Sequence, residues 1–494
     1  MKTLPASLPS GAGLGLVLAL FSACAVGPDF VRPPLPAADR YTRVPLPPAT
    51  AAASGHAQQF GADSPLVSDW WRLFRCEPLD AAVRASLVNN PTLQAAEASL
   101  EQSQDELRAG EGVFYPRLDA ALDASRQRSA PVQQGQAAPG TIFSLLTLSG
   151  TISYPLDVFG GERRAVEGLR AQADNQRYLA LAARLTLSAN VVDACIARAA
   201  YTAEIRATEQ LLALEDEQLR LTADQVRAGT APYAGLLAVR GAIAANQALL
   251  APLKQRVAQA ADLLAALEGA FPEKADLPEI DLEGLALPVA LPLSLPSDLV
   301  RQRPDILSAE AQLRLASANI GVATAALFPS ISLSGTYGAA STSFSHLSAA
   351  SARFWSVGPS VTVPLFQGGS LWFGRKAAIA ADQQAQALYR QTVLNAFAQV
   401  ADSLQALEHD AEALQAQDAA RDAAAETLGL LQANYRSGLV AYPDVLAADV
   451  LLHEATIADL QAVAQRHQDT VALLVAFGGG WWNGPDAAGA DGAP

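Results

Sequence analysis

The chain repeats itself, and this internal repeat limits its fold more than any other feature of the sequence. The segment NPTLQAAEASL matches RPDILSAEAQL, with Pro91 and Pro304 separated by an offset of 213 residues. Three further pairs of segments follow in the same order at offsets of 213 or 209 residues: FYPRLDAAL with LFPSISLSG, SGTISYPLDVFGG with GPSVTVPLFQGG, and RAGTAPYAGLLA with RSGLVAYPDVLA. Because a repeated sequence indicates a repeated structure, we expect the two halves to contain the same series of elements.

Each half contains two stretches in which apolar and polar residues alternate. Alternation with a period of two is typical of a strand with one apolar face. The four expected strands lie at about 116–125, 141–155, 329–338 and 353–365. In the third strand, Ile331, Leu333 and Tyr337 form the apolar face. Its polar face carries Ser330, Ser332, Ser334 and Thr336.

A long stretch without proline follows each pair of strands. Residues 162–228 and 370–437 are expected to be single helices, each roughly 100 Å long at 1.5 Å per residue. Returning helices are expected at about 234–268 and 443–477, with Pro252 kinking or splitting the first of them. Helices of this length exceed a globular core, so they need neighbouring helices along their length, as in a coiled coil.

The segments outside the repeats have their own character. Lys2, an apolar stretch at 14–21 and the small residues before Cys24 fit a secretory signal of the lipoprotein kind, although an ordinary signal with an incidental Cys24 is the alternative. The expected division is a signal peptide at 1–23, an extended Pro-rich tether at 24–65, a first repeat at 66–269, a Pro-rich linker at 270–296, a second repeat at 297–482 and a disordered C-terminal tail at 483–494.

Composition and motifs exclude several classes of function. The net charge of −15 argues against nucleic acid, which needs clustered Lys and Arg. No P-loop, HExxH or G-x-S-x-G motif is present, and the five histidines lack ligand spacing, so we expect neither an enzyme nor a cofactor or metal site. Cys76 and Cys195 are expected to be free thiols, since three cysteines are too few for a disulfide framework.

Four strands with an apolar face cannot close a barrel alone. Membrane barrels begin at about eight strands, and an open edge in lipid leaves backbone groups unpaired. Three copies would supply twelve strands, with the serine and threonine face lining a water-filled lumen. A soluble sheet packed on helices is the alternative, but it explains neither the helix length nor the signal. The sequence therefore predicts a mixed fold: a trimeric twelve-stranded membrane β-barrel continued by a long α-helical barrel.

The chain resembles the outer-membrane factors of tripartite efflux systems, in the TolC-like superfamily and its NodT-type lipoprotein branch. The resemblance covers Cys24 to Trp482 and rests on CAVGPDFVRPPLP, SDWWRLFRCEPLDAAVRASLVNNPTL, LPSDLVRQRPDILSAEAQL, ANIGVATAALFPSISLSGTYG and VALLVAFGGGWW. It implies a homotrimer in outer-membrane lipid with a coiled-coil tunnel through the periplasm. It also implies a periplasmic adaptor and an inner-membrane transporter as partners, passive export of drugs or other toxic small molecules, and a lipid anchor at Cys24.

The hairpin turns are the strongest candidate sites. Gly229 and Gly438 stand where the long helices must stop, and glycine reaches a left-handed cap without strain. By the resemblance these turns dock the adaptor, with Arg227 and Arg436 as contacts.

The resemblance also implies a gate at the tunnel entrance. Asp444 would form an acidic ring there, flanked by Tyr435 and Tyr442. The alternative is that Asp444 only caps the following helix, and the first repeat has Gly235 at the equivalent place.

Two other functions remain open from the sequence. One is an exit duct for type I protein secretion, and the other, of a different class, is a periplasmic structural coiled-coil protein. The lipoprotein start and the RPDI segment of the second repeat favour small-molecule efflux.

Overall fold

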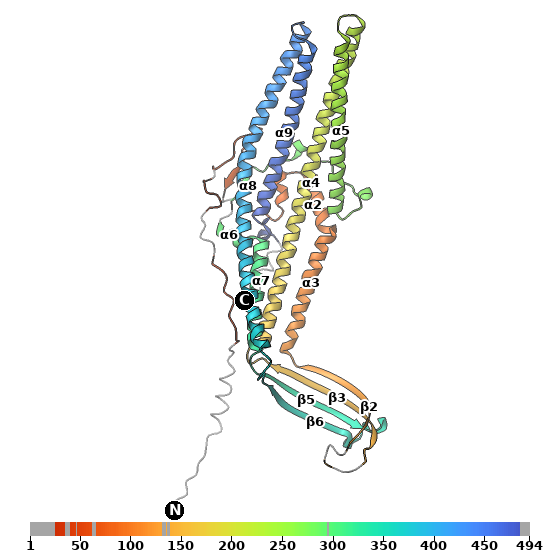
Figure 1. Cartoon of the computed structure of the whole chain (residues 1–494), viewed down its shortest axis with the longest axis vertical. Coiled ribbons are helices and arrows are strands. Elements are labelled where there is room, and N and C mark those ends of the chain that lie inside the picture. The colour runs from red at the N-terminus through yellow and green to blue at the C-terminus, as the bar shows by residue number, and fades with distance from the viewer. Residues whose placement is uncertain are drawn as a thin grey trace, which may run out of the picture. The chain divides into compact units, whose positions relative to one another are not determined.

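The computed structural model describes residues 25–34, 40–45, 47–61, 66–130, 135, 139–293 and 296–484 (Figure 1). The signal peptide, Cys24 and the last ten residues, on which several expectations depend, lie outside the described residues. The chain divides into two compact units, which are considered separately. Unit 1 comprises the described parts of 1–32, 100–175 and 309–389, and unit 2 those of 33–99, 176–308 and 390–494.

Both halves of the chain contain the series of elements that the repeat predicts. The first half has α2 (Glu77–Asn89), α3 (Pro91–Glu111), β2 (Arg117–Arg128), β3 (Ile142–Leu156), α4 (Gly161–Arg227) and α5 (Tyr233–Leu267). The second half has α6 (Pro296–Gln302), α7 (Pro304–Ala325), β5 (Ser330–Ser341), β6 (Arg353–Thr362), α8 (Ser370–Arg436) and α9 (Tyr442–Ala476).

The bounds of some elements differ from the sequence-based expectation for local reasons. β2 continues to Arg128 because that residue still pairs with Ile142 of β3. β6 ends at Thr362, short of the expected 365, and Pro364, which has no N–H for a ladder hydrogen bond, follows it. The helix α5 runs unbroken through Pro252, so the expected split does not occur. The helices α4 and α8 are each 67 residues long, as predicted.

Unit 1 contains one four-stranded antiparallel sheet in the order β2-β3-β5-β6. β3 of the first repeat pairs with β5 of the second, with Thr151 opposite Thr336 and their hydroxyl oxygens 3.2 Å apart. The sheet joins the two repeats side by side (Figure 1). Its outer strands, β2 and β6, each pair on one side only among the described residues, so the sheet has two open edges.

The start of the described chain packs onto the helices of unit 1. Arg164 Nη2 of α4 lies 2.5 Å from Asp29 Oδ1, and Arg32 Nε lies 2.8 Å from Glu310 Oε1 of α7. A Cβ at Gly27, which has a φ of +98°, would lie 2.5 Å from Gly321 Cα, so this approach needs glycine on the left-handed side. The tether is therefore bound to unit 1 at this point.

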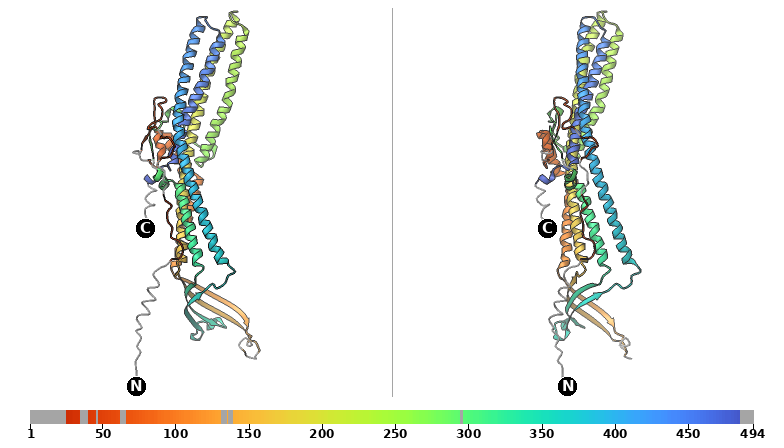
Figure 2. Two further views of the ribbon diagram at one scale, coloured as in Figure 1. Left: turned by 60° about the vertical axis from the view of Figure 1, so that its left-hand side comes forward. Right: turned by 90° about the vertical axis from the view of Figure 1, so that its left-hand side faces the viewer.

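Unit 2 is built from two helical hairpins. The returning helices α5 and α9 lie beside the tip-forming parts of α4 and α8, and the hairpins run side by side in all three views (Figures 1 and 2). Small apolar residues fill the places where the helices meet, including Val191, Ile196, Ala396 and Leu404, all fully buried. The helices of the two hairpins thus support one another, as helices of this length require.

A smaller layer lies on one side of the hairpins in unit 2 (Figure 2). It contains the strap, which we define as residues 47–61 and which ends in β1 (Gln59–Gly61), together with the short helix η1 (Trp70–Phe74). β1 pairs in parallel with β4 (Ala290–Pro292) of the Pro-rich linker. Trp70 and Phe74 are buried in this layer.

Candidate functional site

The two hairpin turns have the same backbone geometry. In the first, Gly229 has a φ of +77° and Thr230 N–H donates to Gln225 O over 2.9 Å. In the second, Gly438 has a φ of +72° and Leu439 N–H donates to Asn434 O over 2.9 Å. A left-handed residue followed by this longer hydrogen bond is the Schellman motif, which satisfies the last carbonyl groups of a helix. Each turn therefore stops a long helix and reverses the chain.

The two arginines at the turns have different surroundings. Arg227 is exposed and forms a close ion pair with Asp224, one turn earlier in α4. Arg436 is exposed at the end of α8, and no ion pair involves it among the described residues. The structure thus leaves the guanidinium of Arg436 available to a partner, whereas that of Arg227 already has a carboxylate.

Two tyrosines lie beside the second turn, and one of them contacts the first hairpin. Tyr435 Oη donates a hydrogen bond to Gln225 Oε1 of the first hairpin over 3.2 Å. The rings of Tyr435 and Tyr442 meet edge to face, with centroids 5.6 Å apart. Both pack against a small core of Leu428, Val445 and Ala448. The gate candidates Tyr435 and Tyr442 are therefore brought together, and one of them bonds the two hairpins to each other.

Asp444 caps the helix α9 in this structure. Its Oδ2 accepts a hydrogen bond from Ala441 N–H over 3.1 Å, at the first turn of the helix. This is the capping alternative, which satisfies an otherwise unpaired amide of the helix start. The side chain is exposed, so a role at a tunnel entrance is compatible with capping.

The candidate lumen residues of β5 belong to a polar face that extends over neighbouring strands. Ser334 lies opposite Ser153 of β3, and Ser332 lies opposite Ser360 of β6. The apolar face is equally continuous, with Tyr337 opposite Trp355 and these side chains 60% and 73% exposed. Apolar side chains this exposed on one face and hydroxyl groups on the other suit a wall between lipid and water.

Comparison with known proteins identifies the family. The family model described as "Outer membrane efflux protein" matches residues 82–270 and 295–479. The chain belongs to the outer membrane efflux proteins. It is 30% identical over 473 residues to the toluene efflux pump outer membrane protein TtgC of Pseudomonas putida, covering 95% of both chains.

Two further comparisons agree with this family. The probable outer membrane lipoprotein SilC of Salmonella typhimurium is 27% identical over 479 residues, which cover 95% of this chain and 98% of SilC. The solved structure of the outer-membrane channel OprN superposes with a TM-score of 0.83 at 27% identity, covering 93% of this chain and all of that one. The predicted family and the predicted fold, four antiparallel strands with long helices in two repeats, are confirmed.

The family also decides the kind of activity and the location. The efflux protein is an outer-membrane channel of an efflux pump, and such proteins transport solutes without catalysing a reaction. Within the described residues no group of three or more potential metal ligands gathers. Cys76 and Cys195 are free, and burial raises the pKa of the Cys195 thiol to about 12. A thiol of such a high pKa is unreactive because the thiolate is the nucleophile.

Buried carboxyl groups between the helices of the efflux protein were not found from the sequence. Asp193 of α4 and Asp410 of α8 each have one buried oxygen without a hydrogen-bond partner among the described residues. Burial, and then the neighbouring Asp469 of α9, raise the pKa of both carboxyl groups to about 7. Nearer the tips, Glu215 is 1% exposed and accepts a hydrogen bond from Asn246 over 2.8 Å.

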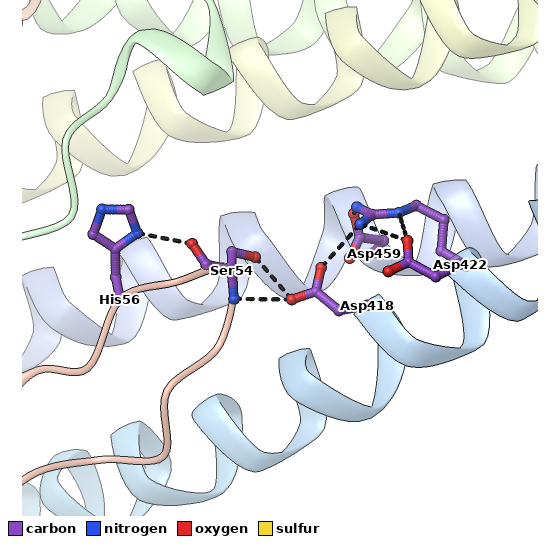
Figure 3. Close-up of polar contacts among 6 residues, drawn as sticks. Ser54, His56, Asp418, Asp422 and Asp459 are labelled. Atoms are coloured by element: carbon purple, nitrogen blue, oxygen red, sulfur yellow. Dashed lines mark hydrogen bonds and ion pairs between the residues drawn. The ribbon is translucent and has the colours of Figure 1, made fainter.

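A second polar cluster attaches the strap to the α8–α9 hairpin (Figure 3). The backbone N–H and the hydroxyl of Ser54 both donate to Asp418 Oδ2, over 2.9 and 3.0 Å. Asp418 also pairs with Arg421, whose Nη1 lies 2.6 Å from Asp459 Oδ2 of α9. In the sequence these acids look like ordinary charges on Ala-rich helices, and only the packing of the helices brings them together.

Proposed function

We propose that three copies of the chain form a passive duct for small molecules, with the two repeats at 66–269 and 297–482 as its building units. The observation that carries this proposal is the sheet with two open edges, a polar face and an exposed apolar face. An edge that stays unpaired in lipid costs several kcal/mol for each group. Three sheets joined edge to edge give twelve strands and no free edge, with Ser330, Ser332, Ser334 and Thr336 facing the lumen.

The helices of three chains would continue this barrel as a tunnel through the periplasm. Leu214, Leu237, Leu249 and Leu430 are 48% to 62% exposed in the single chain, although they lie on long helices. Neighbouring copies would cover such apolar side chains, as in a coiled coil. The tunnel would end at the two hairpin turns, where a periplasmic adaptor would dock and join the duct to an inner-membrane transporter.

The residues at the tips would have two roles in this assembly, docking of the adaptor and narrowing of the entrance. Gly229 and Gly438 shape the docking turns, and Arg227 and Arg436 offer charge to the carboxylates or backbone of the adaptor. Tyr435, Tyr442 and Asp444 would hold the entrance narrow, the last as a ring of three carboxylates that favours cations. Opening would then require the hydrogen bond between Tyr435 and Gln225 to break.

Cys24 would anchor the mature chain to the outer membrane through lipid. Support comes from the small residues before it, from Ala25 in the position after it, and from the lipoprotein relative SilC. Labelled palmitate should enter the wild-type chain and should be absent from a Cys24→Ala variant. Label in that variant would contradict the anchor.

The cargo is proposed to be small toxic compounds, since the efflux pump of TtgC bears the name of toluene. A deletion of this chain in its native host should raise sensitivity to aromatic solvents or antibiotics, and the wild-type gene should restore resistance. A charge reversal, Arg436→Glu, should restore less resistance than the control Lys254→Glu, which lies on α5 away from the turn.

Two outcomes would contradict this proposal. One is recovery of the protein as a soluble monomer on membrane fractionation, as expected of a periplasmic coiled-coil protein. The other is a deletion that leaves sensitivity unchanged but removes an exported protein from the culture medium, as expected of a protein-secretion duct.

A further inference from the structure

Unit 2 contains a cavity of about 750 Å³ between the strap and the base of the α8–α9 hairpin. The turn of the strap at Ser54 and His56 forms one wall, and the end of η1 with Arg72 and Arg75 forms another. The linker segment 282–290 closes a third side. This volume falls in the range of about 300–1,000 Å³ that is typical of small-molecule sites. The cavity is separate from the tips and the strands that the proposed duct uses.

The deepest polar group at this cavity is a buried cation without a carboxylate partner. Arg466 of α9 lines the cavity, and the residue is 1% exposed. Its hydrogen bonds within the described residues go to uncharged oxygens: Gln58 Oε1, Thr50 Oγ1 and His56 O, each at 3.2 Å. The charge of Asp410 acts on Arg466, but no ion pair joins the two within the described part of the chain. Arg466 therefore has no directly paired carboxylate, and its charge adds to the positive potential at this wall of the cavity.

The rim adds positive charge on the opposite wall. Arg75 is exposed, and no ion pair involves it among the described residues, whereas Arg72 is paired with Asp80 at 3.2 Å. Glu283 is the single carboxylate among the residues that line the cavity in the described part of the chain. With Arg72 paired, Arg75 and Arg466 stand against Glu283, which leaves this cavity cationic in a chain with a net charge of −15.

The remaining surface of the cavity is apolar. Leu282 and Leu285 are buried beneath it, and Leu287, Val289, Leu414 and Val463 complete the lining. Such side chains favour a hydrocarbon or aromatic body, because burying apolar surface is favourable by about 25 cal/mol per Å². The lining therefore combines an apolar floor with cationic groups at two sides.

The walls of the cavity are held in place without a ligand. Ser54 is bound to Asp418 of α8 through two hydrogen bonds (Figure 3), and Gln58 Nε2 donates to Pro288 O and to Thr470 Oγ1. Ser54 and Arg75 both have a φ of +49°, and no other non-glycine residue in the described part of the chain has a positive φ. Both line this cavity. Ser54 adopts this φ in the two-residue turn between Ala53 and His56, and Arg75 adopts it at the end of η1, so both belong to turns that shape the walls.

We propose that this cavity is a binding site for an amphipathic anion, an apolar body that carries one carboxylate, sulfonate or phosphate group. The apolar body lies against the linker and the hairpin, and the anionic group pairs with the exposed Arg75, while the buried Arg466 contributes positive potential from its wall. Because the strap, the linker and the α8–α9 hairpin all contribute walls, a bound anion ties these three segments together. The site is distinct from the path of exported solutes.

The test uses the full-length protein reconstituted in nanodiscs, with empty nanodiscs as the blank for lipid partition. 2-Naphthoate is the aromatic anion, 2-naphthamide its neutral counterpart and octanoate an acyl anion, each titrated by calorimetry. We expect naphthoate or octanoate to bind. Arg75→Ala should weaken binding by about tenfold, the order of one charge-assisted hydrogen bond. Arg75→Lys should keep most of the affinity. Val289→Trp, which fills the cavity, should abolish it.

Arg301→Ala, which removes an exposed cation of α6 outside the cavity, is the matched control and should bind like the wild type. Tighter binding of octanoate would identify a lipid-derived anion as the ligand, and tighter binding of naphthoate a soluble aromatic one. The proposal is overturned if neither anion binds, if naphthamide binds as tightly as naphthoate, or if Arg75→Ala and Val289→Trp bind like Arg301→Ala. Circular dichroism of each variant verifies that it is folded.

Discussion

Gly229 and Gly438 hold the two hairpin turns in a conformation that other residues adopt only at a cost. Their φ angles are +77° and +72°, and a Cβ at either position would meet no atom within 4 Å. The requirement is therefore one of backbone conformation and not of space. An alanine in the left-handed region costs about 1–2 kcal/mol. At Gly438 this cost would destabilise the turn that ends α8.

Gly438→Ala should therefore loosen the second tip by about 1 kcal/mol or more. The control is Gly429→Ala, which lies inside α8 and likewise has open space around its Cβ. There alanine should stabilise the helix by up to about 1 kcal/mol. Hydrogen exchange of the peptide 434–441 should become faster in the first variant and not in the second. Equal exchange in both would show that the turn does not depend on the left-handed glycine.

Asp410 predicts a dependence of local stability on pH. Burial, then the hydrogen bond and charge of Asp469, raise the pKa of Asp410 from 3.8 to about 7 in the folded protein. A raised pKa means that the folded state binds the proton more tightly, so this stabilisation is complete below pH 3.8 and is lost as pH rises through 7. Asp193 faces the same cluster and should contribute with the same sign, while Arg466 and His409 lower the pKa of Asp410.

Asp410→Asn should remove much of this dependence, because the amide stays neutral at every pH. Between pH 6 and 8, opening of α8 near Asp410 should rise in the wild type by at most about tenfold per pH unit, the limit for one proton. The variant should open less than the wild type at pH 8. Hydrogen exchange corrected for its intrinsic pH dependence measures this, with Asp402→Asn, an exposed acid of α8, as the control. If opening of α8 in the wild type did not depend on pH, the raised pKa of Asp410 would be refuted.

Sequence alone could place the residues that punctuate the chain but not those that meet across helices. Gly229 and Gly438 were predictable because a helix without proline must stop at a residue that permits a left-handed turn. The contact of Ser54 with Asp418 joins residues 364 positions apart. Which face of a 67-residue helix points inward depends on all its neighbours, so neither this contact nor the effect of Asp469 on Asp193 and Asp410 follows from local pattern.

The repeat predicts the register in which β6 of one copy pairs with β2 of the next. Within the chain, β3 pairs with β5, with Ile152 opposite Gly335. The repeat relates β3 to β6 by 209 residues and β2 to β5 by 213. Applied to this pair, these offsets place Val361 of one copy opposite Leu122 of the next. Both are exposed apolar residues, at 59% and 63%, so the expected pairing would align the two apolar faces.

Cysteines at Asp123 and Ser360, the neighbouring polar pair in this register, should therefore form a disulfide between copies. Directly opposed strand residues have the Cα separation that a disulfide needs. Oxidation in a Cys76→Ser background should yield covalent trimers on denaturing gels. The control combines Asp123→Cys with Val361→Cys, whose side chains point to opposite faces, and should stay monomeric on the gel. Cross-linking of the control alone would refute this register.

Most element bounds were predictable because the alternating and proline-free stretches are long. The repeat also shows each element twice, once in each half of the chain. The strand β6 is shorter than expected because alternation continues past Thr362 in the sequence, although Pro364 cannot donate to a ladder. The linker was expected to be irregular, yet Ala290–Pro292 pairs with Gln59–Gly61. That pairing joins two segments without strong strand patterns, so only the folded layer around η1 reveals it.

In the proposed assembly, the whole molecule is one of three chains that together close a tube. In a monomer its sheet edges would stay unpaired and its leucines exposed, whereas three copies around one axis would cover both. The trimer itself was predictable from sequence by the argument that four strands cannot close a barrel. The cavity between the strap and the α8–α9 hairpin was not, because its walls come from four separate parts of the chain.

We propose that the periplasmic end of the channel is held shut by contacts between the hairpins. The most direct measurement is the conductance of the purified protein in planar lipid bilayers. A closed tip should give small conductance steps for the wild type and severalfold larger steps for Tyr435→Phe, which loses the hydrogen bond to Gln225. Tyr233→Phe, at the first tip, should match the wild type. Absence of conductance from both the wild type and Tyr435→Phe would contradict a channel formed by this chain.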